Sequence, residues 1–376
     1  MGSFEVNNAV CYDDILDIIK LKSIYYQIKK NSKHKDKFVR YELFLTSNLF
    51  TLLFILKKKV YHHGRYNLFL ISDPKFRIIM SEGLDDKIIN HLCSKYLLFP
   101  VLERKMISAS VATRKEMGTK AGILYIKKYM NILKEKKENF YVLKCDVHKF
   151  FYSIDQDVLM QKLKSIYQDE FIIQIMEEII GSTNYSYINE KIDLEVEKAK
   201  NNIIHSRLSL KEKKDKLGEL DRIPRYQYKK GLPIGNMTSQ ILATFYLNDI
   251  DHYIKEKLHI KYYIRYMDDF ILFHESRTYL QFCLKEIERK LDEVRLHLNN
   301  KTQLIEIHQG FNFLGYRFIL KGKKIIVKIN KKTKRKLCHE CKNKSLREKE
   351  AIIKKYNGVF KYSDTNGFLF HLKQNN

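Results

Sequence analysis

The sequence predicts an α+β fold, because helical and strand-like hydrophobic patterns both occur along the chain. Apolar residues recur at helical spacing in residues 12–60 and 84–135, with lysines between them. Alternation predicts strands within Leu258–Phe273, and YVLKC at Tyr141–Cys145 predicts a short buried strand. With 44% hydrophobic residues and only 14 Gly and 4 Pro among 376, the chain can bury a large core, and its length predicts two or three domains.

The net charge indicates a polyanionic partner. The 70 Lys and Arg exceed the 44 Asp and Glu, so the formal charge is +26. Nucleic acid is the commonest partner of such a surface, and an acidic membrane is the competing one. However, the longest apolar stretch, Leu43–Leu56, is broken by polar residues and too short to span, and MGSFEVNNAV lacks signal-peptide and myristoylation patterns. We therefore expect a cytoplasmic protein that binds no membrane.

The N-terminal part predicts helices, a hairpin and more helices. Residues 12–60 predict two or three amphipathic helices, and Tyr66–Met80 predicts a hairpin that turns at Asp73–Pro74. The helical pattern of residues 84–135 is interrupted by a loop around Thr113–Thr119.

Two later segments stand out by their charge. Ile188–Lys229 is dense in both signs yet keeps helical spacing, which predicts an inserted helical hairpin. Lys321–Lys342 carries ten Lys and Arg against the single acid Glu340, and a last helical stretch follows it. Such a basic tail is typical of a lobe that binds a nucleic-acid backbone.

The six cysteines show no disulfide framework, so we expect reduced thiols. Only Cys338 and Cys341 form a CxxC pair. A structural zinc site needs about four ligands, and no second pair lies nearby, so the sequence does not favour zinc.

Three aspartates follow or separate predicted strands. Asp268 and Asp269 lie between YYIRYM and FILF, at the tip of the predicted hairpin, and Asp146 follows the strand YVLKC. Adjacent carboxylates among apolar residues repel each other and lose hydration, and a divalent cation removes that penalty. Three such acids in a basic protein are what two-metal phosphoryl transfer requires. Ordinary turn chemistry for Asp268–Asp269 and a helix N-cap for Asp146 are the alternative interpretations.

Taken together, these motifs resemble those of reverse transcriptases. The order is Asp146 with Phe151 five positions later, then GLPIGNMTSQ (Gly231–Gln240), YMDD (Tyr266–Asp269) and LGY (Leu314–Tyr316). The likeness covers about residues 60–376 and is greatest to bacterial retroelement enzymes. It implies a right-hand fold, with fingers, a palm that contains an antiparallel sheet, and thumb helices, and it implies RNA-templated DNA synthesis.

The resemblance also implies roles for the acids and for the aromatic residue nearby. Asp146 and Asp268 match the ligands of two Mg²⁺ ions, with Mn²⁺ as an alternative, and Asp269 matches the supporting carboxylate. Phe151 matches the steric gate, a ring under the sugar that leaves no room for a 2′-hydroxyl. Phe150 and Phe151 are expected to point to opposite sides, as neighbours on a strand do, so that one of them is a core residue.

Nucleotide contacts are implied for two regions. Lys75, Arg77 and Arg114 match basic positions that contact the triphosphate, although each alone resembles a solvated charge. The remaining matches, which support the template base and the nucleotide, are Pro233, Ile234, Gly235 and Gln240.

Ile234 stands where most family members have Gln, and the IGNMTSQ form resembles diversity-generating retroelement enzymes, which copy RNA with errors at adenines. Related antiviral reverse transcriptases are the other setting considered for this form.

Two more matches lie towards the C-terminus. Lys301 matches the lysine proposed to protonate the leaving pyrophosphate, although a surface lysine would look the same. Leu314, Gly315 and Tyr316 match the primer grip, and lysines of the thumb are expected to track the duplex backbone.

The domains expected on this basis are an N-terminal helical extension (1–60), fingers (61–140), the first part of the palm (141–187), a charged helical insertion (188–229), the rest of the palm with motifs B to E (230–321) and a basic thumb (322–376). The insertion either binds the enzyme's own RNA, a small accessory protein or a second copy of the chain, or is a solvated hairpin.

The leading hypothesis is an RNA-directed DNA polymerase that uses dNTPs, a DNA primer and an RNA template, in a diversity-generating retroelement or an antiviral defence system with a dedicated noncoding RNA. An untemplated or protein-primed nucleotidyl transferase and a non-catalytic RNA-binding scaffold are the alternatives.

Overall fold

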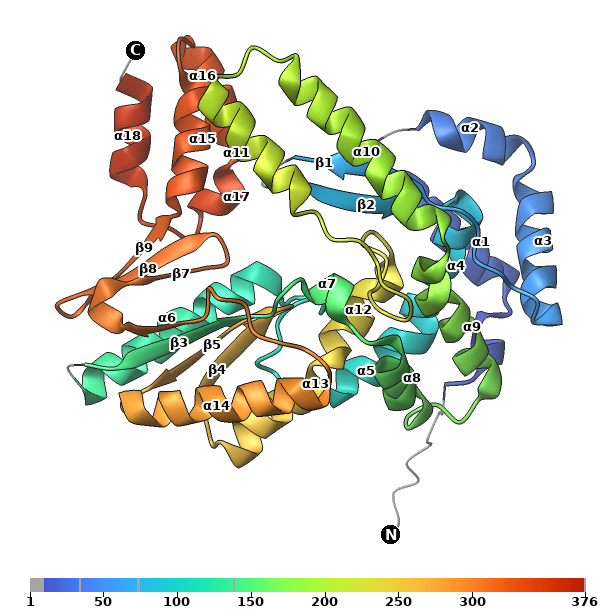
Figure 1. The fold of residues 1–376 in the computed structure, drawn as a ribbon, viewed down its shortest axis with the longest axis horizontal. Helices are drawn as coiled ribbons and strands as arrows, with labels where there is room; N and C mark the ends of the chain where they lie inside the picture. Colours follow the sequence, from blue (N-terminus) through green and yellow to red (C-terminus); the bar gives the residue numbers. More distant parts are fainter. Residues whose placement is uncertain (1–9, 34, 73–74, 138, 375–376) are drawn as a thin grey trace. The chain divides into compact units, whose positions relative to one another are not determined.

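The α+β prediction is confirmed by the computed structural model in Figure 1, which describes residues 10–33, 35–72, 75–137 and 139–374. The described strands form three antiparallel sheets, with the strand orders β1-β2, β4-β5-β3-β6 and β7-β8-β9. Contacts divide the chain into two compact units, which we describe separately. This division does not follow the six domains expected from the resemblance, which remain a prediction.

Unit 1 consists of the chain up to Met106, Lys149–Asn248 and Val294–Leu296. Its elements are η1 (Tyr12–Ile15), α1 (Ile18–Asn31), α2 (Asp36–Leu43), α3 (Leu45–Lys58), β1 (Asn67–Ile71), β2 (Arg77–Ser81), α4 (Leu84–Cys93), the π-helix η2 (Ser94–Leu98), α5 (Phe99–Lys105), α7 (Phe150–Ser153), α8 (Gln156–Lys164), α9 (Glu170–Gly181), η3 (Ser182–Asn184), α10 (Tyr187–Ile204), α11 (Leu210–Asp221) and α12 (Met237–Tyr246).

The charged segment of unit 1 is a pair of contacting helices that covers a hairpin. α10 and α11 contact each other, and α10 also contacts β1. Ile188, Ile192 and Val196 of α10 are buried with Ile78 and Met80 of β2. The apolar residues between the charges therefore have a structural use, because they cover the β1–β2 hairpin. The predicted turn residues Asp73 and Pro74 lie outside the described residues.

Unit 2 consists of Ile107–His148, Asp249–Glu293 and the chain from His297 onwards. Its elements are α6 (Gly118–Lys136), β3 (Tyr141–Asp146), α13 (Asn248–His252, which begins one residue before the unit), η4 (Tyr253–Lys257), β4 (Tyr262–Tyr266), β5 (Asp269–His274), α14 (Arg277–Glu293), β6 (Gln303–Glu306), η5 (Ile307–Gln309), β7 (Phe311–Phe313), β8 (Tyr316–Lys321), β9 (Lys324–Ile329), α15 (Lys331–Cys341), α16 (Leu346–Lys355), α17 (Asn357–Phe360) and α18 (Asn366–Gln374).

The four-stranded sheet of unit 2 is covered by helices that contact different strands. Val142, Ile264 and Ile271 are buried in one cluster with Ile126 and Met130 of α6. Because side chains alternate along a strand, the next residues on β3 and β5 face the other way. α14 contacts β3, β5 and β6. Both faces are therefore apolar, which explains why YVLKC and FILF read as nearly continuous apolar runs.

The β7-β8-β9 sheet was not predicted as strands. Lys321 pairs with Lys324 across the tight turn that joins β8 to β9, so the expected boundary at residue 322 falls inside a hairpin. Six of the ten basic residues of Lys321–Lys342 belong to the hairpin or to the first residues of α15, and their charges hid the alternation of Ile325, Val327 and Ile329.

No single helix in the described residues is long and apolar enough to cross a bilayer. Only together do α2 and α3 reach that length and apolarity, and the chain bends by 79° between them. All six cysteines are free, as expected, and Cys338 and Cys341 both lie on α15.

A buried ion pair supports the β4–β5 hairpin of unit 2. Arg265 on β4 is 1% exposed and forms two bonds to the carboxylate of Asp251, whose side chain is fully buried. Arg265 Nη1 also donates to the carbonyl of Met267 in the turn, at 3.0 Å, and Tyr263 donates to Asp251 at 2.6 Å. The cation therefore ties the core of unit 2 to the backbone of the turn.

Replacing Arg265 with Met should destabilise the protein, because the Asp251 carboxylate would stay buried without its cation. We expect the free energy of unfolding to fall by about 3–5 kcal/mol in urea denaturation. Arg289→Met is the matched control, since Arg289 pairs with Glu286 and Glu293 on the exposed side of α14 and should have a much smaller effect. Equal losses in the two variants would contradict the role given to the buried pair.

Candidate active site

The three predicted acids meet at one end of the four-stranded sheet. Asp146 ends β3, and Asp269 begins β5 directly opposite it in the antiparallel register. Opposite residues in such a pair have Cα atoms about 4.5–5.5 Å apart. Asp268 occupies the turn after Met267, which has a positive φ of 58°, and its carbonyl accepts a hydrogen bond from Val147 at 3.3 Å. Asp146 therefore lies at a strand end and does not cap a helix.

The carboxylates at this end of the sheet are poorly neutralised by the side chains of the protein itself. Burial, opposed by Lys144 and reinforced by the neighbouring charges of Asp146 and Asp268, raises the pKa of Asp269 to about 7. Lys144 Nζ lies 3.4 Å from Asp269 Oδ1, and this oxygen is buried without a hydrogen-bond partner among the described residues. A cation in contact with the carboxylate would lower its pKa and satisfy the oxygen.

The acids are adjacent on the backbone, but their side chains do not form a ready-made metal site. Over the described part of the chain, no three His, Cys, Asp or Glu side chains are grouped so that they could hold a metal ion. Asp146 and Asp269 are nevertheless adjacent through strand pairing. The strand register therefore places side chains with hard carboxylate oxygens, the ligands that Mg²⁺ prefers, next to each other.

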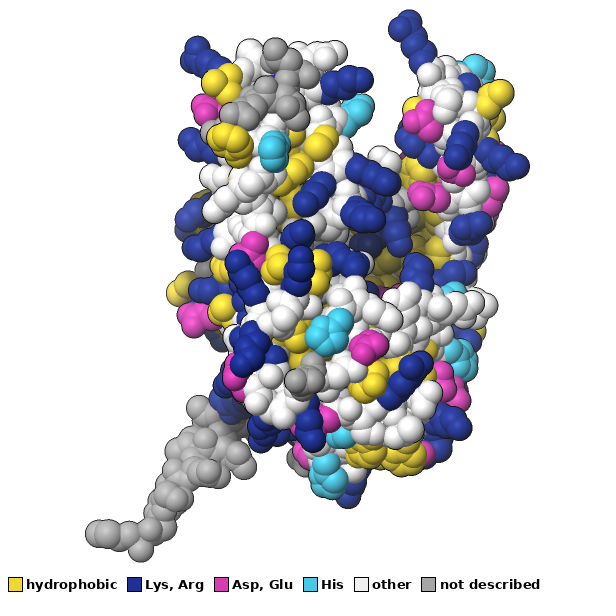
Figure 2. Space-filling model, turned by 90° about the vertical axis from the view of Figure 1, so that its left-hand side faces the viewer, with side chains coloured by type: hydrophobic (Ala, Val, Ile, Leu, Met, Phe, Trp, Pro, Cys, Tyr) yellow, Lys and Arg dark blue, Asp and Glu magenta, His cyan; other side chains and the backbone are white. Residues whose placement is uncertain are grey.

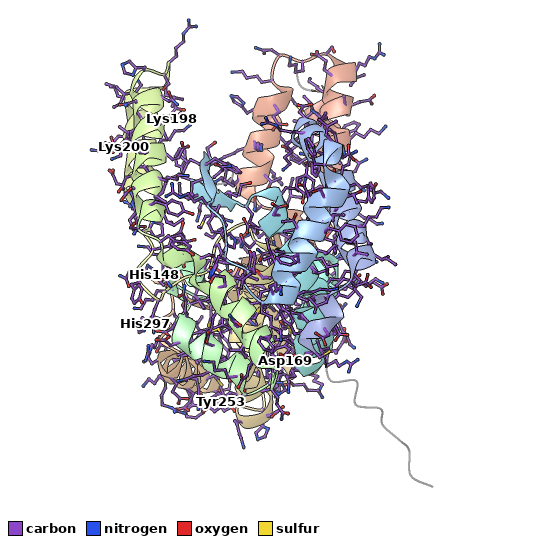
Figure 3. The ribbon with its side chains drawn as sticks, turned by 90° about the vertical axis from the view of Figure 1, so that its right-hand side faces the viewer. His148, Asp169, Lys198, Lys200, Tyr253 and His297 are labelled. Carbon is purple, nitrogen blue, oxygen red and sulfur yellow. The ribbon has the colours of Figure 1, made fainter. Side chains whose placement is uncertain are left out.

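Lys301 follows a segment that is bonded to the strand of Asp146. Asn299 N donates to the carbonyl of Asp146 at 2.7 Å, and Lys301 N donates to Asn299 Oδ1 at 3.1 Å. The Lys301 side chain is exposed. His148 and His297 lie on the two bonded segments, joined by a 2.9 Å backbone hydrogen bond, and Figure 3 labels both. Sequence reasoning passed over these histidines, because nothing in their spacing indicates that they meet.

The predicted primer grip is a two-residue turn between β7 and β8. Leu314 and Gly315 have positive φ angles of 52° and 82°, and Phe313 pairs with Tyr316 across them. Tyr316 is buried and donates to the carbonyl of Val359 at 2.9 Å. Gly315 is exposed, so the turn presents backbone rather than side chain to its surroundings.

In unit 1, the GLPIGNMTSQ segment is held against β2 and α7. Met80 N donates to the carbonyl of Ile234 at 2.8 Å, and Leu232 N donates to the carbonyl of Phe151 at 2.8 Å. Gly235 has a φ of 139°, and a Cβ atom there would lie 2.3 Å from the carbonyl oxygen of Met80. Only glycine fits this approach. Gln240 is exposed on the first turns of α12, and Pro233 is buried.

The expectation that Phe150 and Phe151 are neighbours on a strand was wrong. Both residues lie on the short helix α7 and not on a strand, so they do not face opposite sides of a sheet. Phe150 is 2% exposed and Phe151 is partly exposed, with their ring centroids 5.9 Å apart. Lys149, with a φ of 44°, turns the chain from β3 into α7. Phe151 thus remains available beside the GLPIGNMTSQ segment.

The predicted basic contacts fall into different units. In unit 1, Arg77 is exposed at the first position of β2 and Lys75 is exposed two residues before it, and Met80 of the same strand bonds to Ile234. Arg114 belongs to unit 2, is partly buried, and donates through Nη1 to the carbonyls of Ile107 and Ser110 at 2.9 and 3.3 Å. Part of its guanidinium therefore holds its own loop.

Two supporting residues were missed at the sequence level. Lys144 pairs with Asp269, and Arg265 with Asp251 supports the turn that carries Asp268. The available signal was a lone basic residue inside each apolar strand, YVLKCD and YYIRYM. A charge within a buried strand usually has a partner.

The sequence profile of the reverse transcriptase (RNA-dependent DNA polymerase) family matches residues 57–318. The chain therefore belongs to this family. A comparison with curated proteins finds none that matches the sequence.

Solved telomerase structures resemble the chain at low identity. Apo telomerase from Candida tropicalis, truncated from its C-terminal domain, is 15% identical over 76% of this chain and 60% of its own, with a TM-score of 0.46. Telomerase from Candida albicans in complex with a TWJ fragment of telomeric RNA is 15% identical over 82% and 58%, with a TM-score of 0.43. The chain thus spans 60% or less of these telomerase chains.

Replacing Gly235 with Ala should destabilise unit 1, because both the positive φ and the contact with the Met80 carbonyl oppose a Cβ atom. We expect thermal denaturation to show a loss of more than about 1 kcal/mol. Gly218→Ala, inside α11 with open space where the added methyl group would lie, should instead gain about 0.5–1 kcal/mol. A harmless Gly235→Ala change would show that the segment is not held against β2 as described.

Proposed function

We propose that this chain is an RNA-directed DNA polymerase that copies an RNA template into complementary DNA by two-metal nucleotidyl transfer. The observation that carries the proposal is the direct pairing of Asp146 with Asp269, with Asp268 in the adjoining turn, in a chain of the reverse transcriptase family. Carboxylates at one sheet end are the donor set that this chemistry uses.

Asp146 and Asp268 would hold two Mg²⁺ ions, or Mn²⁺ in their place, and Asp269 would support them. When bound, the ions activate the attacking 3′-oxygen and neutralise the leaving group. Lys301, which follows the segment bonded to Asp146, would donate a proton to the leaving pyrophosphate.

The nucleotide would be selected by residues of unit 1. Phe151 would exclude a 2′-hydroxyl, and the backbone at Gly235, which has no side chain, would allow close approach of the nascent pair. Lys75 and Arg77 would contact the triphosphate, and Arg114 of unit 2 would add to them. Leu314, Gly315 and Tyr316 would hold the primer end. Ile234 supplies an apolar side chain where a polar contact is usual in the family, which supports lower fidelity.

The partners follow from the charge. Lys and Arg side chains are spread widely over the face shown in Figure 2, with fewer Asp and Glu. A surplus of +26 suits the phosphates of an RNA template and a DNA primer. The IGNMTSQ segment supports a bacterial setting, either a diversity-generating retroelement or an antiviral system with a dedicated noncoding RNA, in the cytoplasm. A small accessory protein or a second copy would bind α10–α11.

Asp268→Asn and Asp146→Asn should each abolish primer extension on an RNA template, because each removes one carboxylate charge from the site. We expect a loss of more than about 10³-fold in rate for each. Mn²⁺ binding, followed by electron paramagnetic resonance, should weaken in parallel, and melting temperature should be kept. Asp215→Asn, at an exposed position of α11 in unit 1, is the matched control and should leave synthesis unchanged.

Sequencing the product decides between the alternatives. Complementary DNA with errors at adenines would support a mutagenic retroelement enzyme, and faithful copying of a co-purified RNA would support the defence setting. Full synthesis by Asp268→Asn would refute the metal assignment. Elongation that persists after ribonuclease treatment would support an untemplated transferase instead.

Phe151→Ala should relax sugar selection, because the ring would no longer fill the space of the 2′-hydroxyl. We expect the ratio of kcat/KM for dNTP over rNTP to fall by about 10–200-fold, the range for a contact of this kind. Phe282→Ala, which removes a phenylalanine that is 51% exposed on α14, is the control. An unchanged ratio would assign Phe151 to packing alone.

A further inference from the structure

Unit 2 contains a strongly basic pocket that the polymerase site does not use. The pocket has a volume of about 600 Å³ and lies between α6 and the β8–β9 hairpin. Its charged lining consists of Lys127 and Lys134 from α6, Lys321, Lys323 and Lys324 from the hairpin, and Asp364. Five ammonium groups thus face one carboxylate.

The single carboxylate of the pocket, that of Asp364, is already hydrogen bonded within the protein. Asp364 accepts a hydrogen bond from Val327 N at 2.8 Å. Lys134 donates to the carbonyl of Lys323 at 3.0 Å, and Lys127 donates to the carbonyl of Tyr362 at 3.4 Å. Among the described residues, one ion pair involves a lysine of this pocket: Lys134 Nζ lies 3.8 Å from the carboxylate of the exposed Glu135. The positive charge of the pocket is therefore largely uncompensated.

The turn of the hairpin holds three of these lysines close together. Gly322 has a positive φ of 55°, and Lys321 pairs directly with Lys324 across the two-residue turn. Like charges opposite each other on an antiparallel pair are destabilising. A bound polyanion would relieve this repulsion, and lysine ammonium groups are suited to phosphate as point charges.

The pocket lies at the far end of unit 2 from the acids. Lys134 is near the end of α6, before β3 begins at Tyr141, whereas Asp146 ends β3 five residues later, about 17 Å further along the strand. Lys321 is likewise five residues along β8 from Tyr316, again about 17 Å from the 314–316 turn. The hairpin lysines of the pocket are thus separated by the length of a strand from the acids and from the predicted primer end, whereas Lys127 lies closer to that end, five residues along α6 from Gly122, which packs against Leu314.

We infer that this pocket binds the phosphate backbone of an RNA segment that lies outside the stretch being copied. The lining has lysines but no aromatic ring on which a base could stack, so it would recognise backbone and not sequence. The inference rests on the proposed function for the identity of the nucleic acid, and it adds a second attachment point for the template RNA. The face shown in Figure 2 includes the outer end of the β8–β9 hairpin.

Binding of labelled nucleic acid to the full chain tests the inference, without dNTPs or metal ions. Fluorescence anisotropy would compare a short primer–template duplex with the same duplex carrying long single-stranded RNA extensions. For Lys323→Gln/Lys324→Gln, we expect weaker binding of the extended RNA only, with the slope of log K against log salt reduced by about 2. Lys257→Gln/Lys285→Gln removes two exposed lysines elsewhere in unit 2 and should change neither.

Each other outcome overturns the inference. Unchanged binding of the extended RNA would show that the pocket does not bind it, and equal weakening of both ligands would place these lysines on the primer–template duplex. Binding of acidic peptide or anionic lipid vesicles that depends on these lysines, with RNA unaffected, would assign the pocket to another partner. Primer extension by the unaltered chain on the short primer–template duplex separates the two proposals, because absent synthesis by that chain, with the expected binding pattern in the variants, would refute the polymerase and not the pocket.

Discussion

The buried pair of Arg265 and Asp251 is the interaction on which the end of unit 2 that carries the three candidate acids depends. A guanidinium that is 1% exposed must be neutralised, and Asp251 on α13 does this. Tyr263 donates a further hydrogen bond to the Asp251 carboxylate. The same cation donates to the carbonyl of Met267, so the turn before Asp268 is fixed by a group in the core. A tight turn with a positive φ at Met267 is thereby held by a hydrogen bond from a buried side chain.

This rigid support carries a site that is electrostatically unsatisfied. Asp269 has a raised pKa because it is buried near two other acids, and Lys144 compensates only in part. A site that is poorly neutralised by the protein itself is suited to bind cations. The basic pocket between α6 and the β8–β9 hairpin has an excess of ammonium groups instead, and it is suited to bind phosphates. The two ends of unit 2 thus attract opposite charges.

The sequence predicted a good part of the fold. Short apolar runs around YVLKC and YYIRYM with FILF became β3, β4 and β5, and the Tyr66–Met80 alternation became β1 and β2. The prediction failed in two places. The many lysines of β8 and β9 hid the alternation of their apolar residues. Phe150 and Phe151 were predicted to lie on a strand, but they lie on the helix α7, which follows Lys149 with its positive φ.

By itself, the sequence determined the family and predicted which acids form the site, because strand ends, a YMDD turn and a glycine-bearing segment are local patterns that can be read directly from the sequence. Tertiary structure alone decided that Asp146 lies opposite Asp269, that Lys144 and Arg265 support them, and that Gly235 must be glycine because the Met80 carbonyl occupies the space of a Cβ atom. It also decided that five lysines from two distant segments share one pocket. Register and long-range packing depend on which elements meet, and no local pattern carries that information.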